Sequence, residues 1–309
     1  MTLQQLQYIT ALDHHRHFVK ASESCFVSQP TLTMGVKKLE DEMGVKLFDR
    51  SNKPLTTTPA GRAIVAQARQ ILRGVNNLKA YVSEDYNKLE GEFRLAIIPT
   101  LAPYFLPRWL PAVSAALPNI KLMIREMTAP EIVSAFDREE LDLALLSTPL
   151  LENGLREIPL FHEPFHLFSS EVKNADIIPS VKAGELDASE LILLEEGHCF
   201  REQMLALCGK REAAGPGAYT YLSGSIEAVK NLIKENKGTT LVPQLAINSD
   251  SDWEYVAPFK EPIPSREISL ICHNTFIHEL LLRKLGECAR AVIPEHFEKQ
   301  NPRFRVEWK

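Results

Sequence analysis

The sequence predicts an α/β protein in two parts: a small all-helical N-terminal part and a larger C-terminal part of two α/β lobes. Three observations support this prediction. The chain has 309 residues, more than one ordinary hydrophobic core accommodates. Apolar residues up to residue 82 recur at helical spacing, with short breaks. From Phe93 onwards, strand-like and helix-like segments alternate.

The first 44 residues read as three short helices. In the first of them apolar residues repeat every three positions: Leu3, Leu6, Ile9 and Leu12. A second stripe opens at Phe18. Ser28 is a suitable N-cap for a third helix, and Pro30 falls in its first turn, where its missing N–H costs nothing. Two helices and a tight turn in about 25 residues predict a helix-turn-helix, which we place at residues 18–37.

The next segment predicts a small hairpin or wing, followed by a long helix. Short apolar pieces alternate with polar residues over 45–57. Thr58 can cap the following helix, with Pro59 at its first position. That helix carries a near-heptad apolar stripe: Ala60, Ile64, Ala68, Ile71, Val75, Leu78 and Val82. We therefore predict a winged helix-turn-helix domain over 1–58 and a dimerising linker helix over 59–89.

The remaining residues, 90–309, predict the two α/β lobes. Strand patterns at 93–98, 120–126 and 141–146 alternate with helix patterns at 106–117 and 131–138, which is typical of a parallel sheet. A second such set is expected over about 164–263. A strand at 267–273 and a helix through Val292 then return to the first lobe. The expected bounds are 90–163 and 268–309 for lobe I and 164–267 for lobe II.

The charge distribution fits a DNA partner at one end only. The net charge is −5, but residues 1–90 hold 12 Lys and Arg against 9 Asp and Glu. A mildly basic N-terminal part joined to an acidic remainder favours local DNA contact with little indiscriminate binding. No stretch of about 20 apolar residues could span a bilayer and no secretion signal is seen, so we expect a cytoplasmic protein without a membrane partner.

Five cysteines, an odd and widely spread number, do not form a disulfide framework. None has the short Cys/His spacing of a zinc site, and the sequence therefore predicts neither a metal nor a cofactor. Three of them lie in apolar periodic contexts and are expected to be small core residues: Cys25, Cys272 and Cys288.

The third helix has a polar face suited to reading DNA. Short hydrogen-bonding side chains can reach base edges, and cations can reach phosphates. The candidate DNA-binding residues are Ser28, Gln29, Pro30, Thr31, Thr33, Lys37 and Arg50, with Lys38 and Lys53 as further backbone contacts. The alternative is a polar face that touches only water, because helix-turn-helix units also occur as plain packing motifs.

These residues lie within strings that resemble the N-terminal signature of LysR-type transcriptional regulators: HRHF at 15–18, ASESCFVSQPTL at 21–32 and KLEDEMGVKLFDR at 38–50. The resemblance extends over the whole chain. It implies a winged helix-turn-helix that binds double-stranded operator DNA, and a linker helix that pairs two subunits. It also implies a two-lobed effector domain like a periplasmic binding protein, further pairing of dimers into tetramers, and RNA polymerase as a partner.

A pair of thiols forms the second candidate site. Cys199 follows His198 at the start of a helix-like segment that we expect to end at Cys208. Backbone N–H groups at a helix N-terminus favour the reactive thiolate. Nine helical residues would hold the two thiols about 13 Å apart, whereas a disulfide tolerates about 7 Å. A disulfide would require refolding, which indicates a switch; the alternative is two inert buried cysteines.

The segment GHCFR at 197–201, with Cys208, resembles the redox signature of the peroxide-sensing LysR-type regulators. That resemblance implies that hydrogen peroxide oxidises Cys199 to a sulfenic acid, that Cys208 resolves it to a disulfide, and that oxidative-stress defence genes are activated. It also implies a peroxide pocket made by Thr100, His198 and Arg266, with Arg266 stabilising the thiolate. Where the group carries a second pocket threonine the sequence reads MTA at 127–129, so either Thr128 replaces it or that hydrogen bond is missing.

Two rival functions remain open at this point. The first is a LysR-type regulator whose lobes bind a small organic effector between them, with incidental cysteines. A redox sensor would instead change its thiol count with peroxide and need no metabolite. The second rival is a thiol peroxidase, which has no use for residues 1–90, so we expect the protein not to be an enzyme.

Overall fold

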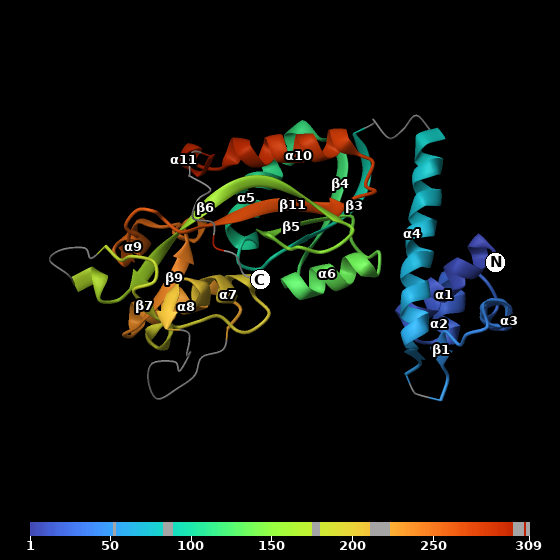
Figure 1. The fold of residues 1–309 in the computed structure, drawn as a ribbon. Helices are drawn as coiled ribbons and strands as arrows, with labels where there is room; N and C mark the ends of the chain where they lie inside the picture. The colour runs from blue at the N-terminus through green and yellow to red at the C-terminus, as the bar shows by residue number, and fades with distance from the viewer. Residues whose placement is uncertain (52–53, 83–88, 175–179, 211–222, 299–305, 307–309) are drawn as a thin grey trace. The chain divides into compact units, whose positions relative to one another are not determined.

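The computed structural model describes residues 1–51, 54–82, 89–174, 180–210, 223–298 and 306 (Figure 1). They form two compact units, one built mainly from residues 1–88 and the other from most of the remaining chain. As the sequence predicts, the first is mainly helical and the second combines helices with a mixed sheet. Within the described ranges, no helix is both long and apolar enough to cross a membrane.

The N-terminal unit has the predicted order of elements: α1 (Leu3–His15), α2 (Phe18–Ser24), α3 (Gln29–Met43), β1 (Phe48–Asp49), β2 (Thr56–Thr57) and α4 (Pro59–Val82). The Ser28 side chain caps α3 by accepting a hydrogen bond from the Thr31 N–H. The Thr58 hydroxyl caps α4 by accepting from the Gly61 N–H at 2.9 Å. Strands β1 and β2 pair antiparallel as a short wing. These ends follow from capping chemistry that the sequence displays.

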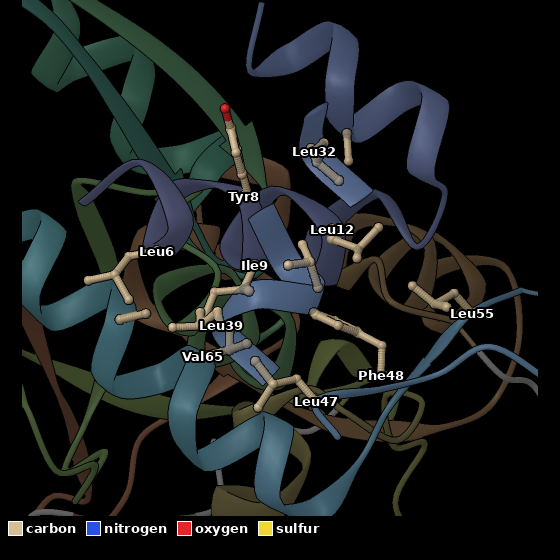
Figure 2. Packing of buried hydrophobic residues seen from close by; sticks show 13 residues of the cluster. Leu6, Tyr8, Ile9, Leu12, Leu32, Leu39, Leu47, Phe48, Leu55 and Val65 are labelled. Atoms are coloured by element: carbon tan, nitrogen blue, oxygen red, sulfur yellow. The ribbon is translucent and has the colours of Figure 1, made fainter. Parts of the chain in front are cut away.

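An apolar cluster holds the described residues of this unit together (Figure 2). Its buried members come from all four helices and from the wing: Leu6, Tyr8, Ile9, Leu12, Ala21, Leu32, Val36, Leu39, Leu47, Phe48, Leu55, Val65 and Ala68. The stripe predicted on α4 is therefore divided between two uses. Ala68 is buried in this cluster and Ile64 packs against it, whereas Ile71 and Leu78 are 43% and 65% exposed. The prediction that the whole stripe faces a partner helix is wrong for Ile64 and Ala68.

The second unit is built around one mixed sheet. Its first elements are β3 (Glu90–Ile97), α5 (Ala102–Ala116), β4 (Asn119–Glu126), α6 (Ala129–Asp137), β5 (Leu143–Thr148) and β6 (Leu155–Ser169). Strand β3 lies parallel to both β4 and β5, as predicted, and β11 (Ser265–His273) adds antiparallel to β5. Helix α10 (Glu279–Val292) packs on α5, where the Trp109 indole N–H donates to the Leu285 carbonyl at 3.3 Å.

Strands β6 and β11 are long and connect the two lobes (Figure 1). Residues 155–164 of β6 pair with β11, and residues 165–169 pair antiparallel with β9 (Thr239–Pro243) and β10 (Val256–Ala257). The remaining elements are β7 (Leu186–Asp187), α7 (Cys199–Ala206), β8 (Cys208–Lys210), α8 (Ile226–Glu235), α9 (Asp250–Trp253), α11 (Glu295–Glu298) and the 3-10 turns η2 (Val172–Asn174), η3 (Ala188–Glu190) and η4 (Gln244–Ala246).

The second lobe departs from the predicted parallel set. The part of the sheet formed there by β6, β9 and β10 is antiparallel, and among the described residues of this lobe the parallel ladder is the short pair β7 and β8. Strand β6 was not predicted, because Pro159 and Pro164 interrupt it and proline is rare inside sheets. Pro159 is tolerated because the register between β6 and β11 shifts there.

Candidate functional site

Cys199 is the first residue of α7 and is buried against the first lobe. The chain enters the helix through Gly197, whose φ of +92° is a conformation that favours glycine. The thiol accepts hydrogen bonds from the backbone of Ser147, on β5, and of Phe200, in its own helix. The predicted position at a helix N-terminus is therefore confirmed.

Arg266, on β11, lies fully buried beside this thiol. Its Nε donates to Glu163 Oε2 at 2.9 Å, and its Nη2 lies 2.8 Å from the same oxygen. Its Nη1 donates to the Thr100 hydroxyl at 3.0 Å, and its Nη2 to the Thr100 carbonyl at 3.1 Å. The guanidinium carbon stands 5.6 Å from the centre of the Phe200 ring. The structure thus brings Thr100, Arg266 and Cys199 together, and it adds Glu163, which the sequence reading missed.

The protonation of Cys199 differs from the sequence expectation. Burial raises the pKa of the thiol to about 11, although Arg266 and the backbone hydrogen bonds act to lower it. The expectation of a pKa below the ordinary thiol value is therefore wrong for this conformation. The physical reason is that removal from water disfavours the thiolate, while the Arg266 charge is already paired with Glu163.

His198 flanks the thiol and is itself buried. Its Nε2 lies 3.6 Å from Glu195 Oε1, and it interacts electrostatically with Glu131 at the start of α6. The backbone of Gly224 passes so close that an added Cβ would lie 2.7 Å from this Nε2. The imidazole therefore lies beside the Glu195 carboxylate and a backbone segment at Gly224 that leaves no room for a side chain.

Thr128 is engaged in capping rather than free. Its hydroxyl and its backbone N–H both donate to Glu131 Oε2 at 2.8 Å, and its carbonyl accepts from the Ile132 N–H. These bonds lower the pKa of the Glu131 carboxyl. The hydroxyl retains only acceptor capacity, so a role for Thr128 in the peroxide pocket stays a prediction.

Cys208 lies outside α7, which ends at Ala206, so the expected helix end is wrong by two residues. Cys208 instead opens β8, where it pairs with Leu186 of β7, and its thiol donates to the Met204 carbonyl at 3.2 Å. Burial raises the pKa of Cys208, and the Asp187 carboxylate raises it further. Both thiols are free, and α7 spans about 10 Å from Cys199 to Ala206, more than the roughly 7 Å between Cα atoms that a disulfide tolerates.

Gln203 was also missed, although it lies four residues after Cys199, on the same face of α7. It is fully buried, and its Nε2 donates to the Ser147 hydroxyl and to the Val306 carbonyl, both at 2.9 Å. Within the described part of the chain its Oε1 has no hydrogen-bond partner. The spacing of four residues from Cys199 was the signal that could have found it.

The remaining cysteines behave as structural residues in part. Cys272 and Cys288 are buried, as predicted, whereas Cys25 is half-buried and packs against the N-terminal cluster. Burial raises the pKa of each of these three thiols. Like Cys199, all three are therefore held mainly as neutral thiols in this structure.

The predicted DNA-reading face is exposed on α3 and just before it. The solvent-exposed members are Ser28, Gln29, Pro30, Thr31, Lys37 and Lys38, whereas Thr33 is half-buried. The hydroxyls of Ser28 and Thr31 lie 2.8 Å apart and bond to each other. The exposed N-terminal turn of this helix presents the short polar groups that base edges and phosphates require.

Arg50 has an internal partner that the sequence did not indicate. Its Nη2 donates to Glu40 Oε2 at 3.1 Å, and its guanidinium stands 5.3 Å from the centre of the Phe18 ring. Buried Glu40 also accepts the backbone N–H groups of Leu47 and Phe48. Arg50 therefore anchors the wing, and its predicted DNA contact stays a prediction. Lys53 lies outside the described residues.

Comparison with known proteins is consistent with both sites. The family described as "Bacterial regulatory helix-turn-helix protein, lysR family" matches residues 3–62, and "LysR substrate binding domain" matches 87–294. The chain is 33% identical over 304 residues to the DNA-binding transcriptional dual regulator OxyR of Escherichia coli K12, covering 97% of this chain and 98% of that protein.

Two solved structures extend this likeness to the fold. A full-length OxyR variant from Pseudomonas aeruginosa is 31% identical, with a TM-score of 0.77 over 95% of this chain and 99% of that one. An H2O2-bound mutant of OxyR from Corynebacterium glutamicum is 25% identical, with a TM-score of 0.58 over 94% of this chain and 92% of that one. The chain belongs to the LysR family of bacterial transcriptional regulators and, within it, to the OxyR group.

Proposed function

We propose that this protein senses hydrogen peroxide at Cys199 and converts the signal into altered operator binding. The observation that carries the proposal is the buried cluster in which Arg266 bonds Thr100 and acts electrostatically on the Cys199 thiol. A cation and a hydroxyl beside a thiol are the groups that the reaction with a peroxide uses: the cation favours the thiolate, and the hydroxyl can hydrogen-bond the peroxide oxygen. The OxyR relatives, one of them solved with H2O2 bound, support this assignment.

The proposed chemistry has two steps. The Cys199 sulfur, having lost its proton, attacks one peroxide oxygen; the O–O bond breaks, and the leaving oxygen takes protons and departs as water, leaving a sulfenic acid. The Cys208 thiolate then attacks the Cys199 sulfur, forming the disulfide and releasing a second water. Thr100 and His198 are the proposed hydrogen-bonding groups for the peroxide. No turnover partner is required, and we propose a stoichiometric sensor rather than an enzyme.

The DNA-binding output is assigned to residues 1–58, with residues 59–89 as the dimerising helix and 90–309 as the effector domain. Within the latter we propose the lobe bounds 90–163 with 268–309, and 164–267. We propose that the dimer pairs into a tetramer on DNA and contacts RNA polymerase. Because operator DNA and polymerase are found there, the proposed site of action is the cytoplasm.

The test is to map disulfides in peroxide-treated protein by mass spectrometry. We expect one new linkage, Cys199 to Cys208, together with a changed operator footprint. An unchanged thiol count and footprint would overturn the proposal. In that case a small organic effector that binds between the lobes, detectable by a metabolite-dependent footprint in the absence of peroxide, takes its place.

The DNA-reading face gives a separate prediction. Gln29→Ala is expected to weaken binding to the operator by about 1 to 3 kcal/mol per lost base contact and to leave random DNA unaffected. Lys37→Ala, on the same exposed face, is expected to weaken binding to both duplexes and to reduce the salt dependence. Titrating both duplexes at two salt concentrations measures this. Equal losses on both duplexes for Gln29→Ala would remove that residue from base recognition.

A further inference from the structure

The Arg266 guanidinium is held by contacts that turn it toward Glu163 and Thr100. These contacts engage all three of its nitrogens: Nε and Nη2 with Glu163 Oε2, Nη1 with the Thr100 hydroxyl, and Nη2 with the Thr100 carbonyl. The ion pair is completely buried, with both side chains 0% exposed. A buried guanidinium that is fully engaged elsewhere gives a nearby thiol only part of its field.

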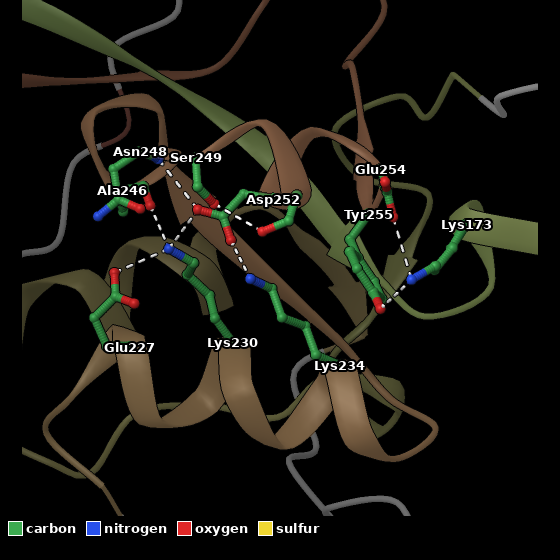
Figure 3. A network of polar contacts seen from close by, with 11 residues as sticks. Lys173, Glu227, Lys230, Lys234, Ala246, Asn248, Ser249, Asp252, Glu254 and Tyr255 are labelled. Atoms are coloured by element: carbon green, nitrogen blue, oxygen red, sulfur yellow. Dashed lines mark hydrogen bonds and ion pairs between the residues drawn. The ribbon is translucent and has the colours of Figure 1, made fainter.

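Glu163 is itself fixed from the second lobe. Its Oε1 accepts the backbone N–H of Leu245, in η4, at 2.7 Å. The next carbonyl along the chain, that of Ala246, accepts from the buried Lys230 ammonium at 2.5 Å. As Figure 3 shows, Lys230 also pairs with Glu227 and with Asp252. The carboxylate that holds Arg266 is therefore built into a hydrogen-bonded frame, and it is not a mobile counter-ion.

We infer that Glu163 is a positioning residue: by pairing with the Arg266 guanidinium it fixes that cation and weakens the attraction of Arg266 for a thiolate at Cys199. This inference rests on the proposed role of Cys199. It adds a control on reactivity: the strength of the pair with Glu163 sets how far Arg266 favours the thiolate of Cys199. The raised pKa of Cys199 in the presence of a buried cation agrees with it.

Other titratable groups lie near the same site, and the test leaves all of them unchanged. They are His198 and Glu195 beside the thiol, Glu131 from α6, and Tyr104 and Glu227 from α5 and α8. Burial, together with the Glu227 carboxylate, raises the pKa of Tyr104, so it stays neutral. Arg266 is the cation that lowers the pKa of Cys199, and Glu163 is its ion-pair partner.

The experiment measures the pKa of Cys199 from the ultraviolet absorbance of its thiolate, with the Cys199→Ser protein of each variant as the blank. For Glu163→Gln we expect the pKa to fall by about one unit or more, a tenfold or larger change in the thiolate fraction at neutral pH. The matched control is Glu267→Gln. Glu267 follows Arg266 on β11, and its buried carboxylate lies on the opposite face of the strand, where it accepts from the Thr148 hydroxyl and pairs with His162. We expect this control substitution to change the pKa of Cys199 little.

A double-mutant cycle separates positioning from the simple charge of Glu163. In the Arg266→Met background, removing the Glu163 charge is expected to move the pKa much less than in the native background. Equal shifts in both backgrounds, or no shift for Glu163→Gln, would overturn the inference. The double variant removes both buried charges and is expected to fold even if Glu163→Gln alone does not. Glu163→Asp keeps the negative charge but moves the carboxylate farther from Arg266. It should lower the pKa of Cys199 in the same direction as Glu163→Gln, by a smaller amount.

Because absorbance reports the thiolate without peroxide, this result is independent of the proposed function. If Glu163→Gln shifts the pKa of Cys199 but peroxide does not oxidise the native protein, the inference about Glu163 holds and the proposed sensing function is wrong. If the pKa does not shift but the native protein forms the Cys199 to Cys208 disulfide, the sensing function holds and the inference is wrong.

Discussion

Replacing Cys199 by Ser is expected to make the protein blind to peroxide while leaving operator binding by the reduced form intact. Serine is close in size but has no redox chemistry, so the buried site keeps its packing and loses its reaction. After peroxide treatment, the thiol count of the variant should stay at its starting value and its DNA footprint should not change. Thiol titration and footprinting with and without peroxide measure both.

Cys208→Ser tests the second step of the proposed chemistry, in which Cys208 resolves the sulfenic acid. The first oxidation should proceed, but without a resolving thiol the sulfenic acid at Cys199 persists and is open to irreversible over-oxidation. Trapping by a sulfenic-acid reagent should therefore succeed in this variant and fail in Cys199→Ser. Cys272→Ser is the control, because that thiol is buried on β11 and is expected to take no part. A normal peroxide response in Cys199→Ser would show that another thiol carries the signal.

The second large effect is expected on assembly. Leu78→Glu should abolish dimers, because Leu78 is 65% exposed on α4 and a self-complementary interface would bury the new charge twice. We expect a loss of about 3 kcal/mol or more, which is over about a hundredfold in the dimer dissociation constant. Sedimentation measures the change, and operator binding should be lost in parallel.

Two controls define this result. Leu151→Glu places the same charge at a similarly exposed apolar residue that lies outside α4, and the dimer should survive. Ala68→Glu should instead unfold the N-terminal unit, because Ala68 is buried within its own subunit. A dimeric Leu78→Glu protein would refute pairing through this face of α4.

The sequence was most informative where a local rule decides the structure. The starts of α3 and α4 were predictable from Ser28, Pro30, Thr58 and Pro59, since capping depends on neighbours within one turn. Family motifs placed Thr100, Arg266 and Cys199 in one site although 166 residues separate Thr100 from Arg266. That contact follows from the sheet order and not from any local pattern.

The sequence was least informative where contacts between distant segments decide what a residue does. The apolar stripe on α4 carries no sign of which residues its own subunit buries, so Ile64 and Ala68 were assigned to the partner helix. Glu163 sits between proline-interrupted apolar pieces that hid β6, and nothing local shows that it neutralises Arg266. The pKa of Cys199 was mispredicted for the same reason, because burial and a remote counter-ion decide it.

The complete burial of the Arg266 and Glu163 pair has a consequence for a cell under osmotic stress. Mobile ions screen exposed charges over about 8 Å at physiological ionic strength but scarcely reach a pair with no solvent exposure. Phosphate contacts made by exposed cations such as Lys37 weaken steeply as salt rises. Shrinkage of the cell should therefore change how often the operator is occupied, while the peroxide concentration that triggers oxidation stays constant.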